Sequence, residues 1–271
     1  MIATLPAPLL RRLERVEARR TVTTPITLDA VALSLRGGIE PDPWQTAVLR
    51  GTATQIALLC CRQSGKSTTA ATLGLSVALT KPGVVVLVLS PGERQSRLLF
   101  KTMLRTYGAA GRPVPAEAEN KLSLELANGS EIHALPGNEA TVRGFSDVAL
   151  ILVDEAARVP DDLYMAVRPM LAVSGGRIVL MSTPFGKRGF FWQEWTEGGP
   201  DWHRTKITVY GVPRIPPAWI AKERARIPDW WFRQEYLCEF VETEDTAFAF
   251  ADVEASLTAD VVPLGAGRVF A

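Results

Sequence analysis

The chain has 271 residues, of which 47% are apolar and 22% charged, and its formal net charge is +1. This balance excludes an intrinsically disordered chain, and the length allows one large domain or one domain with an appendage. The chain has 30 basic and 29 acidic residues, so a global positive field that would attract nucleic acid is also excluded. Any contact with nucleic acid must therefore come from a local basic stripe.

The N-terminal residues 1–36 are basic and weakly periodic, and we expect a mobile arm with one short helix there. No apolar run reaches the roughly 18 residues of a membrane span, so no membrane partner is expected. The cysteines are odd in number and lack zinc-ligand spacing, which argues against a disulfide framework and a structural zinc site. They are Cys60, Cys61 and Cys238.

Short apolar runs alternate with helix-forming segments in the middle of the chain, which is the pattern of an α/β domain. The runs carry apolar residues at consecutive positions, as strands do when both faces of their sheet are covered. We therefore predict a mostly parallel sheet with helices on both faces. The predicted strands are 55–60, 84–89, 148–153 and 177–181, and the predicted helices are 66–79 and 93–107.

Two further segments predict a hairpin and a helical subdomain. Asn128-Gly129 lies between the apolar runs 122–126 and 131–135, which indicates a β-hairpin. From about Phe190 onward, tryptophan and proline crowd the sequence, and we expect a small helical subdomain packed against the sheet. The tryptophans of this stretch are Trp192, Trp195, Trp202, Trp219, Trp230 and Trp231.

A candidate phosphate loop lies between the first predicted strand and the first predicted helix. A loop in this place directs backbone N–H groups and a helix N-terminus at a polyphosphate. Lys66 would reach the β- and γ-phosphates, and the Ser67 hydroxyl would bind Mg²⁺. The full pattern G-x-x-x-x-G-K-[ST] has glycine where this chain has Cys60, so the match rests on its second half and on its strand–helix context. The nucleotide-binding candidates are Arg62, Gln63, Ser64, Gly65, Lys66, Ser67 and Thr68.

A second motif, Asp154-Glu155, follows the apolar run 148–153. Asp154 would hold Mg²⁺ through water, and Glu155 would polarise the attacking water. Taken alone, an acidic pair after a strand indicates a helix N-cap with first-turn charge. Downstream of a Lys-Ser phosphate loop, at the distance of two or three βα units, the catalytic interpretation is favoured. The two motifs together predict a RecA-like P-loop NTPase core of the ASCE class, with Lys66 and Glu155 as catalytic residues.

With Ser182-Thr183-Pro184, these motifs resemble the ATPase domain of the large terminase subunit of tailed bacteriophages, over about Asp42 to Phe250. That family commonly departs from glycine at the position of Cys60. Without the resemblance, Arg143 would be interpreted as a surface ion pair and Pro184 as a strand-ending turn. By resemblance, Trp44 and Gln45 form an adenine-recognition motif, Arg143 is a trans-acting arginine finger, and Ser182, Thr183 and Pro184 are a coupling motif that senses loss of the γ-phosphate.

The resemblance implies an ATP-driven motor that translocates double-stranded DNA into a procapsid. Its implied partners are a homo-oligomeric ring of the same chain, a portal protein and a small terminase subunit, and its cofactors are ATP and Mg²⁺. The implied location is the host cytoplasm. The implied division is an arm at 1–36, an ATPase core at 37–210, a lid subdomain at 211–250 and a linker at 251–271 toward a nuclease domain that this chain lacks.

No nuclease activity is expected of this chain. After Phe250 its acids are Asp252, Glu254 and Asp260, which are too few for a two-metal site.

Four basic residues share one face of the predicted helix 93–107, because they are spaced i, i+3, i+7 and i+11. Such a face could follow a DNA backbone without reading bases. A charged helix face is equally typical of solvated surface, so both interpretations stay open. The residues are Arg94, Arg97, Lys101 and Arg105.

Three other functions share parts of this pattern. A helicase-like DNA-dependent ATPase has the same two motifs but usually needs two RecA-like cores, and this length holds one. A P-loop kinase would have no use for Glu155 as a water activator. A nucleotide-gated assembly or scaffold protein would need ATP binding alone, and the presence of Lys66, Asp154 and Glu155 favours turnover over that alternative.

Overall fold

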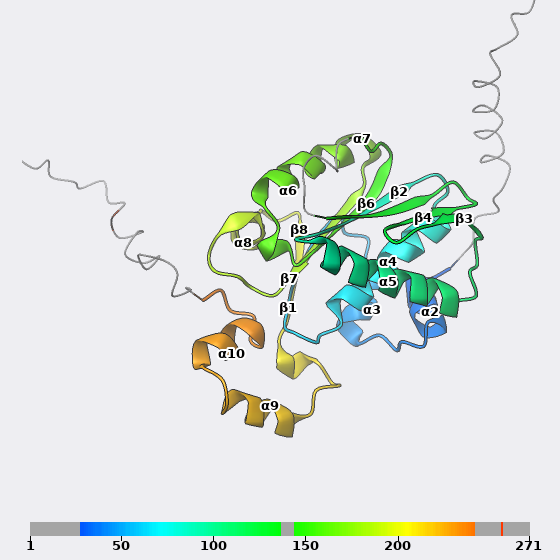
Figure 1. Cartoon of the computed structure of the whole chain (residues 1–271). Helices are drawn as coiled ribbons and strands as arrows, with labels where there is room; N and C mark the ends of the chain where they lie inside the picture. The colour runs from blue at the N-terminus through cyan, green and yellow to red at the C-terminus, as the bar shows by residue number, and fades with distance from the viewer. Residues whose placement is uncertain (1–27, 137–143, 242–255, 257–271) are drawn as a thin grey trace, which may run out of the picture.

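The computed structural model describes residues 28–136, 144–241 and Ser256, in which an eight-stranded sheet is covered by helices on both faces (Figure 1). The strand order is β3-β4-β5-β2-β6-β7-β1-β8. From β5 to β8 all neighbours are parallel, and β4 and β3 extend one end in antiparallel fashion. The strands are β1 (Gln55–Cys60), β2 (Val85–Ser90), β3 (Ala116–Glu119), β4 (Ser123–Leu126), β5 (Glu131–Pro136), β6 (Val148–Asp154), β7 (Arg177–Ser182) and β8 (Trp202–Ile207).

The central strands β1, β2, β6 and β7 are buried along almost their whole length. Their consecutive apolar side chains contact helices on both sides of the sheet, which is the physical reason for runs without polar alternation. The predicted mostly parallel α/β architecture is confirmed.

The helices form two layers (Figure 1). On one face, α4 and α5 pack on β2, β5 and β6, with α2 and α3 beside α4. On the other face, α7 contacts β6 and α8 contacts β8, and α6 packs on α8. The helices are α2 (Ala30–Arg36), α3 (Pro43–Arg50), α4 (Lys66–Thr80), α5 (Glu93–Ala109), α6 (Asp161–Val167), α7 (Leu171–Ser174), α8 (Gly189–Thr196), α9 (Pro217–Arg224) and α10 (Asp229–Glu235), with short 3₁₀ helices η2 (Ala156–Arg158), η3 (Arg168–Met170) and η4 (Val209–Gly211).

The predicted hairpin is also present, and Asn128 ties it to the core. Leu124 of β4 pairs with Ile132 of β5 across the turn. The Asn128 side chain accepts a hydrogen bond from Ser130 N and donates one to Ala78 O, 2.8 Å away, at the end of α4. The turn therefore supplies a partner for one of the carbonyls that a helix leaves free at its C-terminus.

Residues 30–36, which the sequence placed in the N-terminal arm, belong to the folded domain. They form α2, whose Ala30, Val31 and Leu33 are buried and which packs against α3, α4 and α5. Asp29 begins the helix by accepting a hydrogen bond from Val31 N. Seven residues are too few for a clear apolar period, so the sequence pattern missed this docking. Residues 1–27 lie outside the described part.

The sequence predicted a helical subdomain from about Phe190 onward, but this region also contains a strand. Trp202–Ile207 form β8, a parallel edge strand beside β1. Its middle residues are polar or charged because this edge of the sheet faces solvent on one side, so it lacks the apolar run of a central strand. Strand β3 was missed for the same reason, since its residues alternate as Ala-Glu-Ala-Glu.

The described part of the predicted lid, residues 211–241, contains α9 and α10. These helices lie together beyond one end of the sheet, near β1 (Figure 1). The backbone N–H of Arg62, directly after β1, donates to Glu235 O at the end of α10, 3.1 Å away. The lid therefore contacts the loop that follows β1. Among the described residues, no helix is both long and apolar enough to cross a membrane.

Candidate nucleotide site

The candidate site lies where the carboxyl ends of β1, β6 and β7 meet. In open α/β sheets, ligands bind in this position because the loops that follow neighbouring strands converge there. The structure has a cavity of about 490 Å³ at this edge. Seven of the nine residues predicted to bind nucleotide line it, together with Glu155 and Thr183 of the other motifs. The full lining is Arg62, Gln63, Ser64, Gly65, Lys66, Ser67, Thr68, Gln95, Glu155, Arg158 and Thr183.

The loop between β1 and α4 has the backbone of an anion-binding turn. Gln63 has φ 60° and Gly65 has φ 90°, both in the left-handed region, and Gly65 is the N-cap of α4. No side chain caps the first turn of α4 among the described residues. The free N–H groups and the positive end of the helix dipole therefore point into the cavity, where phosphate oxygens are favoured.

Lys66 is nearly buried at the start of α4. Its Nζ lies 3.0 Å from Glu155 Oε1. Burial by itself lowers the pKa of Lys66, but the charges of Glu155 and Asp154 and the hydrogen bond to Glu155 outweigh it, so the pKa is raised. The lysine is therefore held as a cation in the cavity before any phosphate is present.

Asp154, the last residue of β6, is buried beside the phosphate loop. Burial raises its pKa to about 6, opposed chiefly by the charge of Lys66. The Ser67 hydroxyl donates to Asp154 Oδ2 at 3.3 Å. A hydroxyl and a carboxylate side by side are hard oxygen donors that suit Mg²⁺, which commonly binds one or two carboxylates together with substrate phosphates. Among the described residues no cluster of three or more His, Cys, Asp or Glu could hold a metal on its own.

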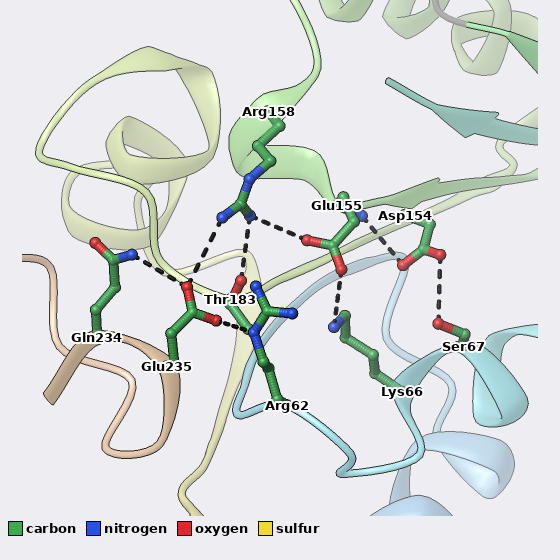
Figure 2. Close-up of polar contacts among 9 residues, drawn as sticks. All are labelled: Arg62, Lys66, Ser67, Asp154, Glu155, Arg158, Thr183, Gln234 and Glu235. Carbon is green, nitrogen blue, oxygen red and sulfur yellow. Dashed lines mark hydrogen bonds and ion pairs between the residues drawn. The ribbon is translucent and has the colours of Figure 1, made fainter. Parts of the chain in front are cut away.

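Glu155 has both carboxylate oxygens engaged. Oε1 pairs with Lys66, and Oε2 accepts a hydrogen bond from Arg158 Nη1 at 3.1 Å. The Glu155 backbone has φ 51°, a left-handed conformation that is costly for a non-glycine residue and concentrates at functional sites. The predicted water-activating carboxylate is thus at the cavity wall, held by two cations (Figure 2).

The predicted coupling motif begins at the last residue of β7, and Ser182, Thr183 and Pro184 are all buried. The Thr183 hydroxyl accepts a hydrogen bond from Arg158 Nη1 at 3.2 Å. The structure therefore brings Thr183 to the same cavity as Glu155, although no local pattern relates the two residues.

Trp44 and Gln45 do not line this cavity. Gln45 is buried behind the phosphate loop, where its Oε1 accepts from Asp42 N at 2.7 Å and its Nε2 donates to Gly65 O at 3.4 Å. The lid residue Arg214 supports the same loop, because its guanidinium pairs with Asp42 and donates to Ser64 O at 2.9 Å. Adenine recognition by Trp44 and Gln45 stays a prediction.

Sequence reasoning missed four residues of the site: Gln95, Arg158, Arg214 and Glu235. Glu235 of α10 is 1% exposed and pairs with Arg62 of the phosphate loop. Its only sequence signal was its place in the stretch that resembles the terminase lid. Arg158 follows Glu155 by three residues, a spacing that puts two side chains on one side of a helical turn.

The remaining predicted residues are Arg143 and the four cations of α5. Arg143 is outside the described residues. Arg94, Arg97, Lys101 and Arg105 are exposed on α5, where Arg97 pairs with Glu93 one turn earlier. Among the described residues, no acid pairs with the other three.

The parallel sheet, the loop between β1 and α4, and the acids at the end of β6 define a RecA-like P-loop NTPase core. Residues 58–255 match the family model described as the N-terminal part of the large terminase subunit, T4likevirus-type, and the chain belongs to this family. The predicted family is thereby confirmed.

Named relatives and solved structures agree with the family. The chain is 25% identical over 251 residues to the large terminase subunit of Thermus virus P23-45, covering 80% of this chain and 52% of that protein. It is 27% identical over 223 residues to that of Escherichia phage T5, covering 78% and 50%. The chain thus spans about half the length of the curated relatives it matches.

Among solved structures, the large terminase ATPase domain of Thermus phage P74-26 superposes with a TM-score of 0.68 at 25% identity, covering 77% of this chain and 97% of that one. The large terminase of bacteriophage HK97 has a TM-score of 0.63 at 16% identity, covering 78% and 54%. The HK97 likeness concerns the fold alone.

Proposed function

We propose that this chain is the ATPase motor domain of a DNA-packaging machine, in which ATP hydrolysis drives translocation of double-stranded viral DNA into a procapsid. The observation that carries the proposal is the convergence of Lys66, Glu155 and Thr183 on one cavity at the phosphate loop. Asp154 is hydrogen-bonded to Ser67, which also lines this cavity. The family of the chain supports the same proposal, because the P74-26 structure that superposes on this chain is a large terminase ATPase domain.

The geometry supports a proposed role for each of these side chains. The phosphates of ATP would lie on the free N–H groups at the start of α4, and Lys66 would exchange Glu155 for phosphate oxygens. That exchange would release Glu155 to orient a water molecule and accept its proton. Ser67 and Asp154 would hold Mg²⁺, which when bound neutralises charge on the phosphates. Thr183 would sense loss of the γ-phosphate and couple it to a movement of the segment after β7.

Assembly into a ring on a portal protein, with a small terminase subunit as a further partner, completes the proposal. In such a ring, Arg143 of one subunit would reach the nucleotide of its neighbour, and an arginine finger contributes about 10³ to 10⁵ in rate. The exposed cations of α5 are the proposed DNA contact, and the proposed place of action is the host cytoplasm.

Steady-state phosphate release from ATP, measured against protein concentration, tests the proposal. We expect specific activity to rise with concentration, and Arg143→Ala to abolish it while nucleotide binding is preserved. A flat activity per chain with a harmless Arg143→Ala would show that the site is not shared between subunits. Absence of turnover in wild-type protein at every concentration would contradict the ATPase proposal for this chain.

Nuclease activity is not part of the proposal. We expect purified protein not to nick supercoiled plasmid in Mg²⁺ or Mn²⁺. Metal-dependent nicking that disappears on substitution of an acid in this chain would contradict this.

A further inference from the structure

Arg158 has no role in the proposed function, yet its side chain contacts three separate parts of the site. It ends η2, the short turn after Glu155. Figure 2 shows its guanidinium between the catalytic carboxylate, the coupling motif and the lid. Nη1 donates to Glu155 Oε2 and to Thr183 Oγ1, at 3.1 and 3.2 Å, and Nη2 lies 3.9 Å from Glu235 Oε1. One side chain thus joins segments that follow β6, follow β7 and belong to α10.

Glu235 is a buried carboxylate, and two arginines, Arg62 and Arg158, lie beside it. Its side chain is 1% exposed, and a carboxylate removed from water is tolerated only when it is paired and hydrogen-bonded. Oε2 accepts from Arg62 Nε, and Oε1 faces Arg158 and accepts from Gln234 Nε2 at 3.2 Å. The two arginines that hold the lid carboxylate therefore come from the phosphate loop and from the turn after Glu155.

The plane of the Arg158 guanidinium is held by an aromatic ring. Its Cζ lies 4.5 Å from the ring centroid of Phe185, whose ring also contacts Arg188 at 5.0 Å. A guanidinium stacked in this way presents its N–H donors in a rigid fork, whereas a lysine ammonium is a point charge without a plane. The stacking therefore favours simultaneous contact with Glu155, Thr183 and Glu235.

We propose that Arg158 is a positioning residue that sets the orientation of Glu155 and links it to the position of the lid through Glu235. The inference rests on the proposed ATPase function. Because Glu155 and Glu235 share one guanidinium, a shift of α10 changes the hold of Arg158 on Glu155. A change in Glu155, when nucleotide draws Lys66 away, is passed to α10 by the same route.

The first test separates turnover from nucleotide binding. Arg158→Ala is expected to lower kcat by about 100-fold, the cost of a misplaced catalytic group, and to change the Kd of a fluorescent ATP analogue less than about threefold. Arg158→Lys is expected not to restore kcat, because the fork and the stacking are lost. The matched control is Arg226→Ala, at an exposed lid arginine with no ion pair among the described residues.

The lid link is tested by combining variants. Glu235→Gln is expected to lower kcat through Arg158, so the double variant with Arg158→Ala should be no slower than Arg158→Ala alone. If the two losses multiply instead, the residues act independently and the link is wrong. Thermal melting of each variant shows whether it folds. If Arg158→Ala does not fold, Arg158→Lys and Glu235→Gln decide the test.

Hydrogen exchange of the 229–241 peptide gives a readout that does not need turnover. In wild-type protein, ATPγS should change exchange in α10, and Arg158→Ala should abolish that change while ATPγS still binds. An equal response in Arg158→Ala and Arg226→Ala would overturn the inference even if wild-type protein hydrolyses ATP. Wild-type protein that binds ATPγS but never hydrolyses ATP would refute the proposed function, and hydrogen exchange would then decide the lid link alone.

Discussion

Two charged regions of this molecule differ in how their charges are held. At the nucleotide site, Lys66, Arg62 and Arg158 each face a carboxylate, and the acids Asp154 and Glu235 are buried. On α5, the four cations are exposed, and only Arg97 has an acidic partner within the described residues.

The difference determines what a substitution will do in each region. Removing one partner of a buried pair leaves the other charge without solvation, which makes its effects large and specific. An exposed cation is solvated on its own, so its loss has little effect on folding and acts mainly through long-range attraction. The nucleotide site should therefore respond to single substitutions in turnover and pH dependence, and α5 in salt dependence.

The largest expected effect is at Glu155. Glu155→Gln keeps the size of the side chain but removes the proton acceptor, so kcat for ATP should fall by about 10² to 10⁴ while ATP still binds. Phosphate release and equilibrium binding measure the two quantities, with Glu117→Gln on the exposed face of β3 as control. Undiminished turnover in Glu155→Gln would show that another group activates the water. ATP binding without turnover in wild type would favour the nucleotide-gated scaffold.

A smaller effect is expected at Asp154 in metal-free buffer, where substitution should increase the stability of the folded protein. Its pKa is raised by burial from 3.8 to about 6, so the folded state holds this proton more tightly than the unfolded state. The stabilising contribution is full below about pH 4 and is lost as the pH rises through 6. Asp154→Asn should therefore raise the free energy of unfolding by about 2 to 3 kcal/mol at pH 8, and much less near pH 4.5.

Urea unfolding with EDTA at both pH values measures this difference. The control is Asp147→Asn, at an exposed acid just before β6. If Asp154→Asn is destabilising at pH 8, the carboxylate contributes more through its contacts with Ser67 and Lys66 than its burial costs.

The smallest effect on folding is expected on α5. The double variant Lys101→Ala, Arg105→Ala should change the free energy of unfolding by less than about 0.5 kcal/mol. If these residues contact DNA phosphates, the slope of log affinity against log salt should decrease in magnitude by about 2. A filter-binding titration across salt concentrations compares it with Lys222→Ala, Arg226→Ala on the lid. Equal slopes in wild type and both variants would place the DNA contact on another surface.

Much of the fold was predictable because its signals are local. The strands β1, β2, β6 and β7 are consecutive apolar runs, and Asn128-Gly129 marks the hairpin. The features that were missed carry weaker local signals. A short helix was expected within residues 1–36, but its packing on the folded domain was not. Strands β3 and β8 have mixed polar and apolar residues because they lie at the ends of the sheet. The site was found in part for the same reason, since the phosphate loop and Asp154-Glu155 are contiguous strings.

By itself, the sequence determined the class of sheet, the phosphate loop and the acids that end β6, because each depends on neighbours along the chain. The tertiary structure alone decided which charges meet. Arg62 and Glu235 are 173 residues apart in the chain but share a hydrogen bond, and Arg158 joins Glu155 to Thr183 and to α10. These contacts form because the buried carboxylate of Glu235 is stable only beside opposite charges. Which segments of the folded chain supply those charges cannot be derived from any local sequence pattern.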